Sequence, residues 1–292
     1  MTGSVPSIRD FPRRSGAADD IDYEIKGNDM QFVEIELDPG ESAIAEAGAM
    51  MFKPASIGMD TVFGDGSQPD SGFLGRLAAA GKRLLTGESL FMTVFTQQGR
   101  GKARIAFAAP YPGTIMPFRL SEMGGALVAQ RDAFLCAAKG VSIGIHLQRK
   151  IGVGLFGGQG FVMQRLEGDG WVFIHGGGTV IERELAPGEE LHVDTGCIAA
   201  MTPDVGFDIV RAGSIKSMVF GGEGFFFAQL TGPGKIWLQS LPFSRLAGRM
   251  RASAGVTSSS GSGGSSWSWG SGGDSDGSSS GGDSGGGDGG GE

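Results

Sequence analysis

The sequence has only two cysteines and three histidines in 292 residues. Cys136 and Cys197 lack the spacing of a metal or redox motif, so we expect buried free thiols in a reducing compartment rather than a disulfide framework. His146, His175 and His192 fit no metal-binding spacing, and each is expected to be a strand residue with a local hydrogen-bond partner. We therefore expect no metal ion and no other cofactor.

Long apolar runs and an excess of basic residues are also missing. No run approaches 18 uninterrupted apolar residues, so no segment is expected to span a membrane. Arg13 and Arg14 lie near the N-terminus, but no apolar stretch follows them, which excludes a secretory or twin-arginine signal. The formal net charge of −8 argues against binding of nucleic acid, which depends on neutralising phosphates. A cytoplasmic location is the expectation.

Motifs of the common catalytic sites are not found either. The sequence has no GxSxG elbow, and Gly81-Lys82 is followed by Arg83 instead of the Ser or Thr of a P-loop. The glycine pairs of GGQG and GGEG lie between expected strands, without the strand-to-helix context of a dinucleotide site. We therefore expect that the protein is not an enzyme.

An internal threefold repeat is the most informative feature that is present. Three stretches align without a gap: AEAGAMMFKPASIGM from Ala45, RDAFLCAAKGVSIGI from Arg131 and VDTGCIAAMTPDVGF from Val193. Each ends in a β-branched residue, a glycine and an apolar residue. The repeat predicts three like-folded β units that bury their apolar sides against one another. The alignment matches Glu46 with Asp132 and Asp194, and Gly58 with Gly144 and Gly206.

Alternating side chains and turn residues predict the strands around these stretches. Val33, Ile35 and Leu37 alternate with Glu34 and Glu36, which indicates a strand with one solvated face, after a turn at 27–29. Pro-Gly turns at 38–40 and 186–188 are each followed by Glu. The middle copy has a longer connection, residues 121–125, in place of this turn.

A glycine phrase also recurs once in each unit, as TGESLFM, GGQGFVM and GGEGFFF. The glycines are expected at sharp corners between strands. Glu88, Gln159 and Glu223 share one position in the phrase, and because Gln is no acid or base, we expect them to hold the corner by hydrogen bonds. The units are placed at about 21–110, 111–180 and 181–250.

Two segments depart from the β pattern. Phe73–Leu85 (FLGRLAAAGKRLL) has apolar residues at helical spacing beside Arg76, Lys82 and Arg83, so it predicts a short inserted helix that either covers the core or touches a membrane surface. Residues 251–292 are rich in Gly, Ser and Asp and are expected to be a disordered tail, as residues 1–20 are expected to be flexible. The fold class predicted is all-β: a pseudo-threefold repeat of antiparallel sheets, β-prism or sandwich-like, in one domain over 21–250.

The repeated acidic residues Glu46, Asp132 and Asp194 are the candidate site. If they converge on a shared axis, their repulsion requires a bound cation or raised pKa values. If they lie apart, each accepts backbone N–H bonds or caps a turn. The sequence leaves both readings open.

Several of these phrases resemble a known family. PGESAIAEAGAMMF, LTGESLF, LFGGQGF, FGGEGFF and LTGPGKIWLQSLP are similar to conserved bacterial and archaeal proteins related to the altered-inheritance-of-mitochondria, or mitochondrial biogenesis, proteins. The resemblance covers about residues 23–247, and it implies a tryptophan RNA-binding attenuator-like β fold, a closed oligomer and no assigned reaction. Fold alone does not fix function.

Two hypotheses of function follow. The first is a non-enzymatic scaffold or binding protein, a homo-oligomer with a trimer favoured, linked to the organisation of a membrane-associated complex. Its tail would display Trp267 and Trp269 to a protein partner, and Phe73–Leu85 would make peripheral membrane contact. The alternative is a small-ligand or carbohydrate binder that uses Trp171, Trp237 and Phe225–Phe227, for which core packing is the competing explanation.

Overall fold

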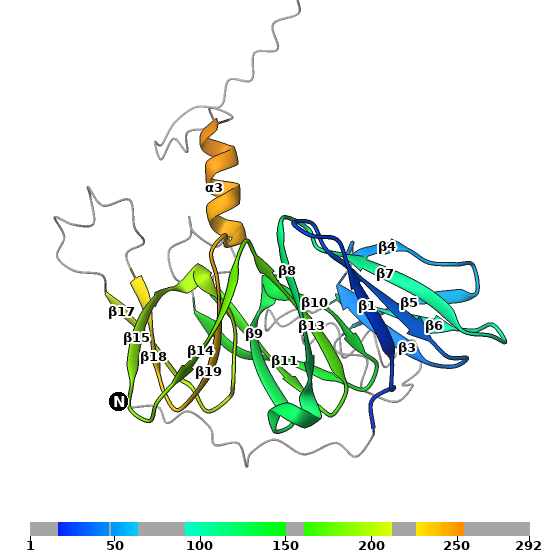
Figure 1. Cartoon of the computed structure of the whole chain (residues 1–292), viewed down its shortest axis with the longest axis horizontal. Helices are drawn as coiled ribbons and strands as arrows, with labels where there is room; N and C mark the ends of the chain where they lie inside the picture. Colours follow the sequence, from blue (N-terminus) through cyan, green and yellow to red (C-terminus); the bar gives the residue numbers. More distant parts are fainter. Residues whose placement is uncertain (1–16, 47, 64–90, 150–160, 212–225, 254–292) are drawn as a thin grey trace, which may run out of the picture. The chain divides into compact units, whose positions relative to one another are not determined.

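The structure is a computed structural model that describes residues 17–46, 48–63, 91–149, 161–211 and 226–253. Within these ranges the chain is mostly β, with nineteen strands in four antiparallel sheets (Figure 1). The predicted all-β class is therefore confirmed. The expected inserted helix at Phe73–Leu85 lies outside the described residues, as do 1–16 and 254–292 of the expected flexible ends.

The four sheets are named A to D. Sheet A has the order β1-β2-β7-β4, with β1 at Asp22–Lys26, β2 at Phe32–Leu37, β7 at Ala103–Ala108 and β4 at Met50–Phe52. Sheet B has the order β5-β6-β3-β10-β13-β8, with strands at Ile57–Phe63, Phe91–Gln97, Ser42–Glu46, Phe134–Ala138, Trp171–Gly177 and Gly113–Arg119.

The other two sheets follow along the chain. Sheet C has the order β11-β12-β9-β16-β19-β14, with strands at Ser142–Arg149, Phe161–Glu167, Ala126–Gln130, Ile198–Met201, Gly234–Gln239 and Val180–Leu185. Sheet D has the order β15-β18-β17, with strands at Glu190–Asp194, Phe226–Thr231 and Gly206–Arg211. Short 3-10 turns are η2 at Leu120–Met123, η3 at Arg131–Ala133 and η5 at Thr195–Cys197, and the helix α3 is at Phe243–Ser253.

The pattern of strand pairing recurs three times along the chain. We define unit 1 as strands β2 to β7, unit 2 as β8 to β13 and unit 3 as β14 to β19. Within each unit of six strands, the first and third strands pair with the sixth, and the second and fourth strands pair with the fifth. The register of the third strand against the sixth is shifted in every unit, as a β-bulge would shift it. The shift falls between Met50 and Phe52, between Phe134 and Cys136, and between Ile198 and Ala200.

Three apolar cores lie between successive sheets. The first core joins sheets A and B through residues such as Ile35 and Phe173, the second joins B and C, and the third joins C and D. Central strands of the inner sheets are accordingly buried on both faces, as in FLCAA of β10. The outer strand β2 alternates instead, with Val33, Ile35 and Leu37 inward, as predicted.

The two predicted Pro-Gly turns form with the same hydrogen bonds. Gly40 and Gly188 have positive φ angles of 92° and 77°, which only glycine adopts without strain. The N–H of Asp38 donates to the Glu41 carboxylate at 2.8 Å, and the N–H of Ala186 donates to the Glu189 carboxylate at 2.9 Å. The Glu after each turn therefore ties the turn to its own beginning.

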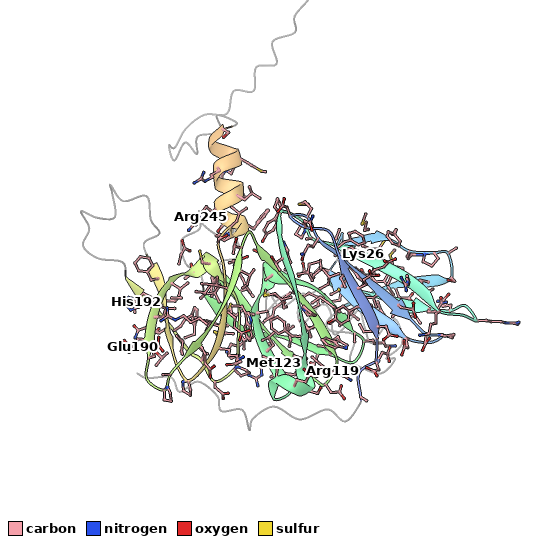
Figure 2. The ribbon with its side chains drawn as sticks, viewed as in Figure 1. Lys26, Arg119, Met123, Glu190, His192 and Arg245 are labelled. Atoms are coloured by element: carbon pink, nitrogen blue, oxygen red, sulfur yellow. The ribbon has the colours of Figure 1, made fainter. Side chains whose placement is uncertain are left out.

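Helix α3 follows the last strand and was not predicted. Its first residue, Phe243, contacts the ring of Tyr111, with ring centroids 5.7 Å apart. Arg245 in its first turn reaches Asp194 at 3.3 Å (Figure 2). Its sequence, FSRLAGRMRAS, does carry a helix signal that the sequence prediction missed, because apolar residues recur at i, i+3, i+4 and i+7, at Phe243, Leu246, Ala247 and Met250.

Candidate functional site

The candidate site lies where the chain crosses from one sheet to the next. In each unit the second strand ends and the third strand begins in the neighbouring sheet. The last residues of these second strands are Glu46, Gln130 and Asp194, and each stands four residues before the start of the register shift. Their partners on the fifth strands are Met92, Met163 and Phe227.

This pairing corrects the predicted alignment of the middle copy. Gln130, and not Asp132, holds the position of Glu46 and Asp194. The error came from the Ile-Gly pair at 143–144, which resembles Ile-Gly at 57–58 but lies two residues further along its strand. The true counterpart of Ile57 is Val141, which is also fully buried.

The carboxyl of Glu46 has a strongly shifted pKa. Burial raises its pKa to about 7, the positive charge of Arg131 lowers it, and the negative charge of Asp132 raises it. Arg131 also pairs with Asp132 at 3.3 Å. The structure thus brings Glu46 and Asp132 into one electrostatic group, around the cation of Arg131.

Gln130 occupies the same position in a more buried setting, with 6% of its surface exposed. The amide nitrogen of Gln239 donates to the Gln130 side-chain oxygen at 3.2 Å and to the Gly196 carbonyl at 2.9 Å. The N–H of Gly177 donates to the Gln239 side-chain oxygen at 2.8 Å. Neutral amides therefore satisfy one another where a charge would be costly.

Asp194 makes a third arrangement. One carboxylate oxygen accepts the N–H of Gly196 at 2.9 Å and so caps η5, and the other pairs with Arg245 of α3 at 3.3 Å. Arg245 also lies 3.8 Å from the sulfur of Cys197. The carboxylate is therefore a structural cap, one of the two readings that the sequence left open.

Convergence of the three carboxylates on a bound cation was one of the two alternatives that the sequence left open. Among the residues that the structure describes, no group of three or more His, Cys, Asp or Glu side chains is arranged to hold a metal ion. The predicted corner residues Glu88, Gln159 and Glu223 lie outside the described residues.

His175 is the counterpart of Gln239 in unit 2, and sequence reasoning did not identify its setting. It is buried in β13 and contacts the Tyr111 ring edge-on, with centroids 4.6 Å apart. Neither ring nitrogen makes a hydrogen bond of standard geometry with the described residues, and the backbone of Tyr111 is the one hydrogen-bonding group that acts on the ring. Burial lowers the pKa of His175 to about 4, and the nearby Tyr111 backbone offsets only part of this.

The cysteines and tryptophans named from the sequence belong to packing. Cys136 is a buried free thiol whose pKa burial raises, and Cys197 forms no disulfide with the described residues. Trp237 packs edge-on against Phe118 with centroids 4.8 Å apart, and Trp171 packs against Tyr23 at 4.9 Å. Core packing thus accounts for both tryptophans. Phe225 and the side chain of Phe226 are not described.

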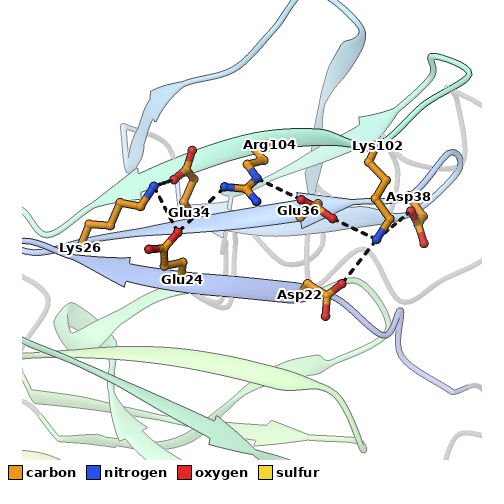
Figure 3. Close-up of polar contacts among 8 residues, drawn as sticks. All are labelled: Asp22, Glu24, Lys26, Glu34, Glu36, Asp38, Lys102 and Arg104. Carbon is orange, nitrogen blue, oxygen red and sulfur yellow. Dashed lines mark hydrogen bonds and ion pairs between the residues drawn. The ribbon is translucent and has the colours of Figure 1, made fainter.

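A network of charges covers the outer face of sheet A (Figure 3). Lys102 pairs with Glu36 at 2.9 Å, and Arg104 pairs with the same carboxylate at 3.0 Å. Hydrogen bonds from Lys102 and then Arg104 lower the pKa of Glu36. Lys26 binds Glu34 on the neighbouring strand β2 and Glu24 on its own strand β1. The network also includes Asp22 and Asp38, which approach Lys102 at 3.6 and 3.5 Å.

An open cavity of about 390 Å³ lies on this face. It is lined by Asp22, Tyr23, Glu24, Glu34, Glu36 and Arg104. The outward direction of Glu34 and Glu36 was predicted from alternation along β2. The cations of Glu36 are Lys102 and Arg104, and Arg104 of β7 lies 68 residues further along the chain, so local patterning gives no signal for that pairing.

Among the described residues, no helix is long and apolar enough to cross a bilayer.

Comparison with known proteins identifies relatives. A protein of Streptococcus pyogenes serotype M6, named uncharacterized, is 31% identical over 228 residues, which cover 76% of this chain and 87% of that protein. The X-ray structure of a Streptococcus pyogenes protein matches with a TM-score of 0.62 and 23% identity over 80% of this chain and 99% of that one, which is a likeness of fold.

A family model described as mitochondrial biogenesis AIM24 matches residues 23–241, which include all the strands from β2 to β19. The matched range contains Glu46, Gln130 and Asp194, where the chain crosses between sheets, and both Pro-Gly turns. The chain therefore belongs to the mitochondrial biogenesis AIM24 family.

Proposed function

We propose that this protein is a non-enzymatic scaffold that assembles with copies of itself in the cytoplasm and organises a membrane-associated complex. The observation that carries the proposal is the way the units are joined. Each internal joint continues a β-sheet from one unit into the next, and among the residues that the structure describes the end sheets A and D each keep an edge of the same kind without such a partner.

The chemistry of the described residues supports a structural role. Glu46, Gln130 and Asp194 share one position, yet one is a half-buried acid, one a buried amide and one a cap of η5. A catalytic role shared by the three equivalent positions would require the same side-chain chemistry in all three units. The carboxylates on sheet A are largely neutralised by neighbouring cations.

The recurrence of the pairing supports a threefold repeat and an attenuator-like β fold as parts of the same proposal. Three units in one chain with matching edges favour a homo-oligomer, and the trimer remains the favoured size. Contact of the tail with a protein partner, and of Phe73–Leu85 with a membrane surface, belong to the proposal as well.

Light scattering coupled to size-exclusion chromatography tests the self-assembly. The full chain has a mass of 30.1 kDa, and we expect a mass that rises with concentration toward a multiple of this value. A constant mass of one chain over the whole concentration range would contradict the scaffold proposal. A thermal-shift screen with sugars and divalent cations gives a second readout, and a reproducible shift would favour the small-ligand alternative instead.

A further inference from the structure

Helix α3 carries charges of one sign only. Its sequence, FSRLAGRMRAS, contains Arg245, Arg249 and Arg251 and no acidic residue. The whole chain has a formal net charge of −8, so this helix is a positively charged segment of an acidic protein. Arg249 and Arg251 are exposed, and Arg251 lies in the last turn, where a cation suits the negative end of the helix dipole.

A row of apolar side chains runs along one side of α3. Phe243, Leu246, Ala247 and Met250 have the spacing that places residues on one helix face, and we call these four residues the apolar row. Phe243 is 50% exposed and Met250 is 62% exposed, while Leu246 and Ala247 are partly exposed. Most helices of soluble proteins turn such a row toward the core. In α3 the row remains partly open to solvent.

The first turn of α3 holds the helix on the sheets. Phe243 packs against Tyr111, with ring centroids 5.7 Å apart. Arg245 pairs with Asp194 at 3.3 Å and donates to the Ser240 carbonyl at 3.4 Å (Figure 2). Among the described residues, the hydrogen bonds, ion pairs and ring contacts between α3 and the sheets all come from this turn. Residues 247–253 therefore extend beyond the anchored part.

A helix of this length needs a further contact to stay ordered to its end. The helix α3 has 11 residues, and isolated helices shorter than about 12–15 residues are only marginally stable in water. In proteins, packing of the apolar face supplies most of the stability of a short helix. A surface that covers Met250 and the rest of the apolar row would supply it here.

Arg249 and Arg251 flank the apolar row. Each residue of an α-helix is turned by about 100° from the one before, so these two neighbours of Met250 fall on opposite sides of it. An apolar row between two cations is typical of helices that lie in a membrane interface. The apolar side chains enter the boundary of the hydrocarbon region there, while the long cationic side chains reach the headgroups.

We propose that α3 docks on an anionic lipid surface, with the apolar row in the interface and Arg249 and Arg251 at the lipid phosphates. The exposed apolar row favours a lipid over a nucleic acid, whose backbone offers polar and charged groups. A short row and two flanking cations give weak, reversible binding that falls as the salt concentration is raised. The inference rests on the membrane association in the proposed function, and it names the element and the lipid chemistry.

Vesicle flotation of the full chain tests the docking. One set of vesicles contains equal parts of phosphatidylcholine and phosphatidylglycerol, and the other contains phosphatidylcholine alone. We expect binding to the anionic vesicles that is at least about fivefold tighter than binding to the neutral ones. Met250→Asp should weaken binding to the anionic vesicles at least about tenfold, because it places a charge in the apolar row. Met59→Asp is the matched control, since Met59 is 56% exposed on β5, and it should leave binding unchanged.

The flanking cations are tested by neutralising them together. Arg249→Gln with Arg251→Gln should weaken binding to the anionic vesicles about tenfold or more, because each arginine near the surface contributes to the attraction. The control is Arg100→Gln with Lys139→Gln, which removes the same charge from exposed positions outside α3. An equal loss in both double variants would show a general effect of net charge and would contradict the assigned role of the two arginines.

The remaining outcomes separate this inference from the proposed function. Equal binding of Met250→Asp and the unmodified chain would overturn the docking of α3, while membrane association through another segment would stand. Equal binding to anionic and neutral vesicles would overturn the anionic surface. If the unmodified chain binds neither kind of vesicle, the inference fails, and light scattering decides on self-assembly independently. Circular dichroism of each variant recognises misfolding separately.

Discussion

Glu46, Gln130 and Asp194 hold the same place in the strand pairing, and they show how the surroundings set the chemistry of a residue. Glu46 is partly desolvated and keeps a raised pKa beside Arg131. Gln130 is more deeply buried and bonded to Gln239. Asp194 accepts a hydrogen bond from a backbone N–H and pairs with Arg245. The residue type at each crossing follows the degree of burial there.

Glu46→Gln should stabilise the protein at pH 8. Burial raises the pKa of Glu46 from 4.5 to about 7, so the folded state holds a proton that the unfolded state loses between these values. Stability therefore falls as the pH rises through this window, and the cost is complete above pH 7. We expect a gain of about 2 kcal/mol at pH 8 and little gain near pH 5, measured by urea unfolding.

The reciprocal variant Gln130→Glu is the matched control. It places a carboxyl at the more buried crossing, opposite the amide of Gln239, and should lower stability at pH 8 by about 2 kcal/mol or more. Identical pH profiles for Glu46→Gln and the unmodified protein would contradict the assigned desolvation of Glu46.

His175→Gln should make the protein less sensitive to acid. Burial lowers the pKa of His175 from 6.5 to about 4, so between these values the unfolded state binds a proton that the folded state does not. Stability is thus lost as the pH falls below 6.5, by about 2 kcal/mol at pH 5. The decrease in the free energy of unfolding between pH 7.5 and pH 5, measured by urea unfolding, should be smaller in the variant. Glu46→Gln is the suitable background, because Glu46 titrates with the opposite sign.

At the scale of elements, the outer strands could be predicted from the sequence better than the inner ones. Alternation in FVEIEL gave the correct inward and outward faces of β2, and the Pro-Gly turns form where the residues indicated. The inner strands ALVAQ and FLCAA are continuously buried, so no alternation marks their faces or register. This is why the middle copy was misaligned by two residues, and why Gln130 was not recognised as part of the site.

Phe52→Asp should weaken self-association without unfolding the chain. The side chain is exposed in the single chain, so the charge meets water there, but it would be covered where the edge strand β4 takes part in the proposed self-assembly. Light scattering should show a lower mass than the unmodified protein at equal concentration. Met59→Asp is the control, because Met59 is 56% exposed on β5, which takes no part in a joint. An equal effect of both variants would argue against self-association through β4.

At the scale of the whole molecule, each core is shared between two sheets, and each inner sheet is shared between two units. The joints link residues such as Ala45 and Cys136, about 90 residues apart, so no local pattern could show which strands meet. The β class could be predicted from the sequence, whereas the order of the strands in the sheets required the structure. Repeat proteins commonly place polar faces at their ends, and the charged face of sheet A fits that role.

Amide hydrogen exchange at low and high protein concentration tests the proposed self-assembly through the edge strands β4 and β15 most directly. The amides of Met50–Lys53 and of Glu190–Asp194 should become more protected as concentration rises, because they gain cross-chain hydrogen bonds. The edge strands β1 and β17 serve as internal references and should not change. Protection of β4 and β15 that is independent of concentration, or that rises equally on β1 and β17, would contradict the account.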